Sequence, residues 1–132
     1  MFNSIFVNLP IENLAKSVDF FTKLGFKFNA QFTGETSTCM IVSDTIYVML
    51  LERAQFQSFI DKKVAEPDTT EVLLSFSCES TDEVRRISEL AFSLGAKQLN
   101  EPTDLGFMFS WGFEDLDGHV WDLFWMNPEH VQ

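Results

Sequence analysis

The sequence predicts an α+β protein built from two tandem β-α-β-β-β modules, whose sheets form a curved mixed sheet shaped like a cup. Each half of the chain shows a strand pattern, then one amphipathic helix followed by a glycine, then further strand patterns. Leu24-Gly25-Phe26-Lys27 also matches Leu94-Gly95-Ala96-Lys97 at an offset of 94 − 24 = 70 residues. One order of elements repeated in this way indicates an internal duplication.

The first module is expected to cover about residues 3–52. A β-branched and aromatic run at 5–9, closed by Pro10, predicts its first strand. From Asn13 to Leu24 the apolar residues fall on one helical face, and Gly25 stands where a helix C-cap is expected. Alternation or β-branched composition predicts the remaining strands at 26–32, 38–42 and 45–51.

The second module is expected to cover about residues 71–127, after a linker at 53–70 that contains a short helix. A strand is expected at 72–78. Ser80 and Glu83 then form a capping box, and the apolar face of the following helix ends before Gly95. Further strands are expected at 98–100, 107–113 and 119–126. Since neither module can bury its sheet alone, we expect residues 1–132 to form a single domain. On periodicity alone, a ferredoxin-like α+β sandwich remains the alternative.

Charge and length exclude several classes of protein. The chain has 132 residues, with 9 Lys and Arg against 20 Asp and Glu, for a net charge of −11. Such a chain repels nucleic-acid phosphates and anionic membrane surfaces. No apolar run approaches the roughly 20 residues of a spanning helix, and the first ten residues lack the basic region of a secretory signal. Cys39 and Cys78 are too few for a disulfide framework, so we expect a cytoplasmic protein.

Two segments carry a resemblance to a known superfamily. One begins at Leu9-Pro10-Ile11-Glu12-Asn13-Leu14 and continues to Gly25. The other is Phe113-Glu114-Asp115-Leu116-Asp117-Gly118-His119, followed by a final strand. Both are similar to the vicinal oxygen chelate superfamily, which includes glyoxalase I, bleomycin-resistance proteins and extradiol dioxygenases; Leu116 replaces the usual Pro. The resemblance implies the glyoxalase-like fold of paired β-α-β-β-β modules, often in a homodimer.

The same resemblance implies where a metal would bind. Metal-dependent members hold a divalent ion with His and Glu at four positions, which correspond here to Phe6, Leu50, Leu73 and Asp122. None of these is His, and Phe6 and Leu73 offer only apolar surface. The two His of the chain are His119, which alternation places opposite Asp122, and His130 near the C-terminus. The sequence therefore predicts no metal. Glu52 or Glu71 could come within reach of the site, and the faces of Glu52, Glu71 and Glu114 remain open.

Asp122 becomes the informative residue of a metal-free site. A carboxylate among apolar residues must find a partner, become protonated or meet a ligand cation. We therefore weigh a carboxylate anchor or general base against a structural hydrogen bond to a nearby Ser, Thr or Tyr47. The predicted binding residues are Phe6, Leu50, Leu73, Phe109, Trp111, Asp122 and Phe124.

An aromatic wall with one carboxylate predicts a small organic ligand, aromatic or cationic. The alternatives are a divalent-metal-dependent lyase or dioxygenase of glyoxalase type with an altered site, and a non-catalytic partner module. Whether any reaction is catalysed remains open.

Overall fold

The computed structural model of the chain describes residues 1–129. The chain divides into two compact units, Met1–Val64 and Ala65–Gln132, which are called here the first and second modules. Each contains one four-stranded mixed sheet and one long helix. The predicted α+β class and the repeated β-α-β-β-β order are confirmed.

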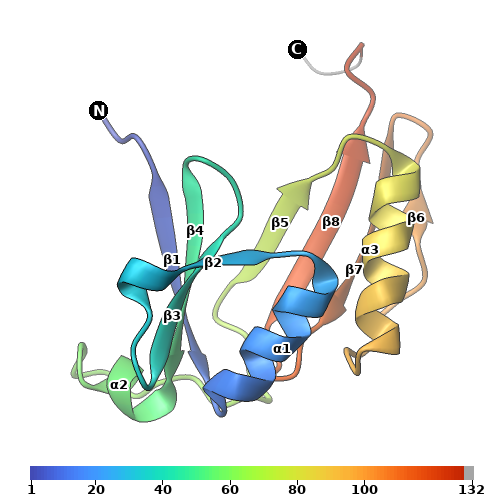
Figure 1. Ribbon diagram of the computed structural model, residues 1–132. Helices are drawn as coiled ribbons and strands as arrows, with labels where there is room; N and C mark the ends of the chain where they lie inside the picture. The colour runs from blue at the N-terminus through green and yellow to red at the C-terminus, as the bar shows by residue number, and fades with distance from the viewer. Residues whose placement is uncertain (130–132) are drawn as a thin grey trace. The chain divides into compact units, whose positions relative to one another are not determined.

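The first module contains β1 (Ile5–Ile11), α1 (Leu14–Leu24), β2 (Lys27–Asn29), β3 (Ser37–Ile41) and β4 (Ile46–Glu52). A 3-10 turn at Ala30–Phe32 follows β2, and the short helix α2 (Arg53–Gln57) follows β4. The sheet order is β1-β4-β3-β2, with β1 parallel to β4 and the other pairs antiparallel (Figure 1).

The second module repeats this plan with β5 (Leu73–Ser77), α3 (Thr81–Ser93), β6 (Thr103–Asp104), β7 (Met108–Glu114) and β8 (Val120–Met126). Its sheet order is β5-β8-β7-β6, again with one parallel pair, β5 with β8. The helix α3 lies along one face of this sheet and contacts β7 and β8 (Figure 1). In the described part of the chain no helix is long and apolar enough to cross a membrane.

Both long helices begin and end where the sequence predicts. The side chain of Asn13 accepts a hydrogen bond from the Lys16 N–H at 3.0 Å, and that of Ser80 accepts from the Glu83 N–H at 3.1 Å. Gly25 follows α1 with φ 115°, a left-handed conformation that costs little only for glycine. Local capping chemistry therefore sets the helix boundaries.

Three of the predicted strands differ from the structure by more than one residue. Pro10 lies inside β1, because β1 is an edge strand and can spare one backbone donor. The strand expected at 26–32 ends at Asn29, whose side chain accepts from the Gln31 N–H and starts the 3-10 turn. The strand expected at 98–100 is absent; only a single bridge joins Lys97 to Glu114 before β6.

Each sheet has one face against the long helix of its module and one face turned away, called here the helix face and the open face. In the first module the helix face carries the buried Leu9, Ile11, Val48 and Leu50, and Glu52 on this face contacts the start of α1. In the second module it carries the buried Phe109, Phe113, Trp121 and Leu123 beneath α3. Each helix face is therefore a module core.

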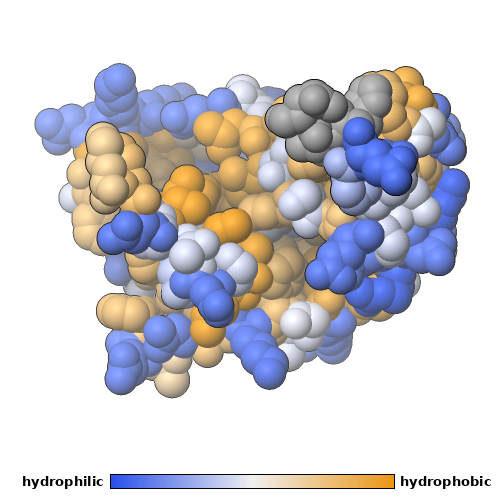
Figure 2. All heavy atoms as spheres, turned by 90° about the horizontal axis from the view of Figure 1, so that it is seen from above, coloured by the Kyte–Doolittle hydropathy of each residue, from blue (hydrophilic) through white to orange (hydrophobic). Residues whose placement is uncertain are grey.

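Some large apolar side chains reach the surface, as the orange atoms in Figure 2 show. They include Phe2, Phe6, Phe59 and Leu73. Not all of the 15 Phe of the chain therefore lie in the cores.

Candidate functional site

Strand register assigns each predicted binding residue to a face. Phe6, Leu73, Asp122 and Phe124 lie on the open faces of their sheets. Leu50, Phe109 and Trp111 lie on the helix faces. The predicted set therefore does not form one surface, because neighbouring strand residues point to opposite sides of a sheet.

The position expected at Leu50 is displaced by one residue. Leu50 pairs with Leu9 on the helix face and is 0% exposed, whereas Phe6 lies on the open face. A slip of one residue moves a side chain to the other side of the sheet. Met49, which pairs with Asn8 on the open face, occupies the place that the prediction gave to Leu50.

Phe109 and Trp111 are structural aromatics beneath α3. Phe109 is 2% exposed, and the guanidinium of Arg85 lies 4.7 Å from the centre of its ring. Trp111 packs edge-on against Phe92 of α3 and donates its indole N–H to the Asn100 carbonyl at 2.9 Å. Both rings lie on the face of the sheet opposite Asp122, so they cannot line one surface with it.

Asp122 lies half-buried in the middle of the open face of the second sheet. As predicted from alternation, Val120 and Phe124 share its face. The hydroxyl of Ser75, its partner on β5, donates to Asp122 Oδ2 at 3.0 Å. The structure thus contains the serine hydrogen bond that the sequence left open as an alternative. This bond uses one of several acceptor positions on the carboxylate, and the remainder can accept from a ligand.

Gly112 flanks Asp122 on the other side, at the paired position of β7. Its φ is 149°, and a Cβ atom there would lie 2.1 Å from the carbonyl oxygen of Trp121. Any side chain would therefore push β7 away from β8. Asp122 consequently has a serine on one side and no side chain on the other.

The open face of the first module is different at the matching places. Phe6 stacks on Tyr47 of β4, with ring centres 4.6 Å apart and planes at 13°. The next row contains Asn8, Met49 and Cys39. This part of the open face therefore presents a stacked aromatic pair rather than a carboxylate.

Asp115 is a buried turn residue rather than an acid or base facing a ligand. Its carboxylate accepts from the Asp117 N–H at 2.9 Å, the His119 N–H at 3.0 Å and the Trp121 indole N–H at 2.9 Å. Burial raises the pKa of Asp115, while His119 and the Trp121 hydrogen bond act to lower it. Through these hydrogen bonds Asp115 shapes the turn that contains Gly118.

Neither cysteine has the properties of a nucleophile. Burial raises the pKa of Cys39, and burial together with the Glu83 carboxylate raises the pKa of Cys78 to about 11. At neutral pH both are therefore thiols, whereas the thiolate is the reactive species.

The three glutamates whose faces the sequence left open lie in different places. Glu52 lies on the helix face, where its Oε2 accepts from the Leu14 N–H at 3.0 Å, so it serves the start of α1. Glu71 lies in the loop before β5. Glu114 lies on the open face with Asp122, diagonal to it across β7 and β8.

Within residues 1–129 there is no group of three or more His, Cys, Asp or Glu side chains placed to hold a metal ion. His119 is in the turn before β8, and His130 lies outside the described residues.

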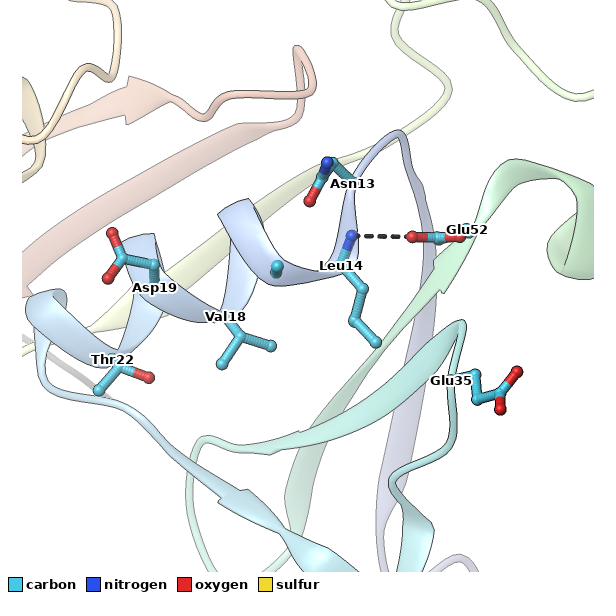
Figure 3. A pocket seen from close by; sticks show the side chains of 8 residues that line it. Asn13, Leu14, Val18, Asp19, Thr22, Glu35 and Glu52 are labelled. Atoms are coloured by element: carbon cyan, nitrogen blue, oxygen red, sulfur yellow. Dashed lines mark hydrogen bonds between the residues drawn. The ribbon is translucent and has the colours of Figure 1, made fainter.

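A separate hollow of about 600 Å³ lies beside α1 in the first module (Figure 3). Leu14, Ala15 and Val18 give it an apolar wall, and Asp19, Glu35 and Glu52 contribute carboxylates. Asp19 is paired with Lys23 at 3.0 Å, and Glu52 with the helix start. The hollow contains none of the predicted binding residues, and its carboxylates are partly engaged within the module.

Sequence reasoning missed Ser75, Gly112 and Met49. Strand alternation could have placed Ser75 and Met49 on their faces, once the strand partners were known. A glycine inside a strand, such as Gly112, is itself a signal of close backbone approach. The pairing of Ser75 with Asp122 joins residues 47 positions apart and required the fold.

Comparisons with known proteins agree with this geometry. The family model described as the Glyoxalase/Bleomycin resistance protein/Dioxygenase superfamily matches residues 4–123. No curated protein matches the chain.

Several solved structures share the fold. A hypothetical protein from S. aureus is 27% identical, with a TM-score of 0.79 and 94% of each chain covered. A glyoxalase-related enzyme from Fulvimarina pelagi is 16% identical, with a TM-score of 0.80, over 95% of this chain and 88% of that one. The fosfomycin resistance protein FosX from Listeria monocytogenes is 18% identical, with a TM-score of 0.68, over 95% and 93%.

Proposed function

Because the chain belongs to the glyoxalase/bleomycin resistance protein/dioxygenase superfamily, we propose that it is a metal-free small-molecule-binding protein of that superfamily. The proposed site is the open face of the second sheet. Asp122 is its polar anchor, and Leu73 and Phe124 are its apolar neighbours. The ligand is a small organic molecule, aromatic or cationic.

The observation that supports this proposal is that the Asp122 carboxylate is oriented by a hydrogen bond and keeps acceptor capacity on a sheet face whose residues are exposed or half-buried. Ser75 orients the carboxylate through Oδ2, and Gly112 leaves the place beside it without a side chain. Sites for small molecules combine apolar surface with few polar groups of defined orientation. Asp122 between Leu73 and Phe124 has this composition.

Phe6 is proposed separately, as a binding surface of the first module by itself, since 47% of its surface is exposed beside Tyr47. Aromatic rings exposed in this way offer area for a flat ligand. We also propose a homodimer in the cytoplasm, as the resemblance and the composition predict.

A second candidate is a divalent-metal-dependent lyase or dioxygenase with an altered site. Glu114 favours it, because this carboxylate shares the open face with Asp122. Two carboxylates suit hard cations such as Mg²⁺ or Mn²⁺, which prefer oxygen ligands, better than they suit Zn²⁺ or Ni²⁺.

The test is ligand screening combined with metal analysis. A thermal-shift screen against a library of small organic molecules is expected to give ligands that stabilise the protein, and Asp122→Asn is expected to weaken those ligands. Asp104→Asn is the matched control, because it removes the same charge from the helix face of the same sheet.

Elemental analysis decides between the candidates. After dialysis against Ni, Zn, Mn or Fe(II) in turn, we expect substoichiometric metal. A stoichiometric metal that is lost in Asp122→Ala would contradict the metal-free proposal and establish the second candidate. No stabilising ligand from the library, together with no metal, would contradict both.

A further inference from the structure

The strands of the second sheet carry acids but no base. Their sequences contain Asp104, Glu114 and Asp122, and no Lys, Arg or His. The strands of the first sheet contain one acid, Glu52, and one base, Lys27. Glu114 and Asp122 share the open face of the second sheet, so this face is negative in its own right, within a chain of net charge −11.

An ionised carboxylate such as that of Asp122 accepts hydrogen bonds but cannot donate them. In residues 1–129 no Lys, Arg or His side chain forms an ion pair with it, and its one side-chain partner is the neutral Ser75. A ligand that binds the remaining acceptor positions of the Asp122 carboxylate must therefore donate hydrogen bonds, and a positive charge on the donor strengthens these bonds. Anionic groups such as carboxylates and phosphates are repelled.

The number of aromatic rings on this face indicates which of two kinds of cation it suits, a quaternary ammonium ion or a cation with N–H groups. Phe124 is the one aromatic residue among the strand positions on the open face of the second sheet. A quaternary ammonium ion, which has no N–H, is recognised by several rings that surround it. Phe124 instead has Ser77 and Ser110 at the paired positions on either side. This arrangement suits a cation that forms hydrogen bonds.

Asp122 and Phe124 are two residues apart on one strand, which places their Cα atoms about 7 Å apart. An amine joined by a short chain to a flat apolar group can reach both. We infer that the site takes a protonated primary amine, with its N–H groups on Asp122 and its apolar body over Phe124. This inference rests on the proposed function and names the ligand class of that site.

A matched ligand series tests it. The probes are 2-phenylethylamine, its N,N,N-trimethyl derivative, 2-phenylethanol and 3-phenylpropanoate, which share the ring and differ in charge and donors. Titration calorimetry or ligand-observed NMR is expected to show the amine binding about tenfold more tightly than the alcohol and the trimethyl compound, as a charge-assisted hydrogen bond allows. The carboxylate is expected to bind weakest.

Substitutions test whether Asp122 is responsible for the preference for the amine. Asp122→Asn is expected to remove about tenfold of the affinity for the amine and to leave the alcohol nearly unchanged, whereas Asp104→Asn leaves both unchanged. Raising the salt concentration to 0.5 M should weaken the amine more than the alcohol. Circular dichroism of each variant shows that it is folded.

Other outcomes would overturn the inference. Equal binding of the trimethyl compound and the amine would mean that charge alone is recognised. Tightest binding by the carboxylate would reverse the predicted sign. In both cases the protein still binds a small molecule, so the proposed function survives. Absence of binding by all four probes would also overturn the inference, and the library screen then tests the proposed function separately.

Discussion

The two open faces differ at matching positions, although the two modules share one fold. The last ladder pair before the connecting turn is Ile41–Tyr47 in the first module and Glu114–Val120 in the second. Tyr47 of β4 therefore corresponds to Val120 of β8, and Met49, two residues after Tyr47, corresponds to Asp122, two residues after Val120. The row around Met49 is completed by Asn8 and Cys39, and the row around Asp122 by Ser75 and Gly112.

The difference shows that the duplicated fold fixes positions but not chemistry. In the first module the central row contains two sulfur-bearing apolar side chains, Met49 and Cys39, and the neutral Asn8. In the second module the same row carries a carboxylate, a hydroxyl that orients it and a glycine that must stay a glycine. A half-buried carboxylate needs hydrogen-bond partners, and Ser75 supplies one to Asp122.

Gly112→Ala is expected to be the most damaging change. The new Cβ would meet the Trp121 carbonyl oxygen at 2.1 Å, at a backbone φ of 149° that side chains rarely adopt. We expect a loss of about 3 kcal/mol or more in the free energy of unfolding, at the upper end of single substitutions. Urea unfolding followed by tryptophan fluorescence measures it, because Trp111, Trp121 and Trp125 all lie in the second module.

The matched control is Cys39→Ala, at the corresponding place in the first module. Cys39 is buried, and its truncation leaves a small cavity that costs about 1 kcal/mol. If Gly112→Ala destabilises the protein no more than Cys39→Ala does, the two rows are equivalent in packing and the contrast drawn above is wrong.

Asp115→Ala is expected to cost about 2–3 kcal/mol, since it leaves buried N–H donors without an acceptor. The buried Trp121 indole and two backbone N–H groups depend on this carboxylate. The corresponding turn of the first module offers the control Ser43→Ala, where a single exposed bond to the Thr45 N–H is lost. We expect less than about 0.5 kcal/mol there. Equal losses at the two turns would show that Asp115 does not hold β8 in place.

The pH dependence of Asp115 has a definite sign. Burial raises its pKa in the folded protein above the ordinary value of 3.8. Between 3.8 and the raised value the folded protein holds the proton more tightly than the unfolded chain does. The contribution of Asp115 to stability is therefore full below 3.8 and is lost as pH rises through the raised pKa.

Asp115→Asn isolates this contribution, because the amide does not titrate. The difference in free energy of unfolding between the parent protein and Asp115→Asn is expected to shift in favour of the parent as pH is lowered from neutral. Urea unfolding at several pH values measures it. A difference that shifts the opposite way would mean that the hydrogen bonds to the carboxylate outweigh its burial.

The sequence could predict those parts of the molecule that depend on neighbours along the chain. Asn13 and Ser80 are N-cap residues that predict where α1 and α3 begin. Alternation along β8 places Asp122 and Phe124 on one face. Leu50 could not be placed, because an uncertainty of one residue changes its face. Phe109 and Trp111 alternate with Met108 and Ser110, a pattern that favours burial of the aromatics, but only the fold shows which face α3 covers.

The two modules can also be compared at the N-caps of their long helices, Asn13 for α1 and Ser80 for α3. Ser80→Ala is expected to cost about 1 kcal/mol, the usual value for a lost N-cap. Asn13→Ala is expected to cost about half as much. The reason is that Glu52 from β4 accepts from the Leu14 N–H and continues to stabilise the start of α1.

The double variant Asn13→Ala/Glu52→Ala, which removes both side-chain acceptors, is expected to bring the loss in the first module up to that of Ser80→Ala. Chemical denaturation of the four proteins, with the parent as reference, gives the values. If Asn13→Ala alone costs more than Ser80→Ala, the carboxylate of Glu52 does not support the helix as its geometry suggests.

The smallest expected effect concerns Arg85 on the helix face of the second module. Arg85 and Arg86 are both exposed residues of α3, but the guanidinium of Arg85 lies 4.7 Å from the ring centre of Phe109. Arg85→Gln is expected to cost about 0.5 kcal/mol, the value of a cation–π contact at an exposed position, whereas Arg86→Gln should be near neutral. Because both variants remove one positive charge, any general effect of the negative chain cancels between them. A difference that persists at high salt assigns the loss to the contact with Phe109. Equal stabilities would leave Phe109 as an ordinary core ring, which α3 covers through its apolar residues alone.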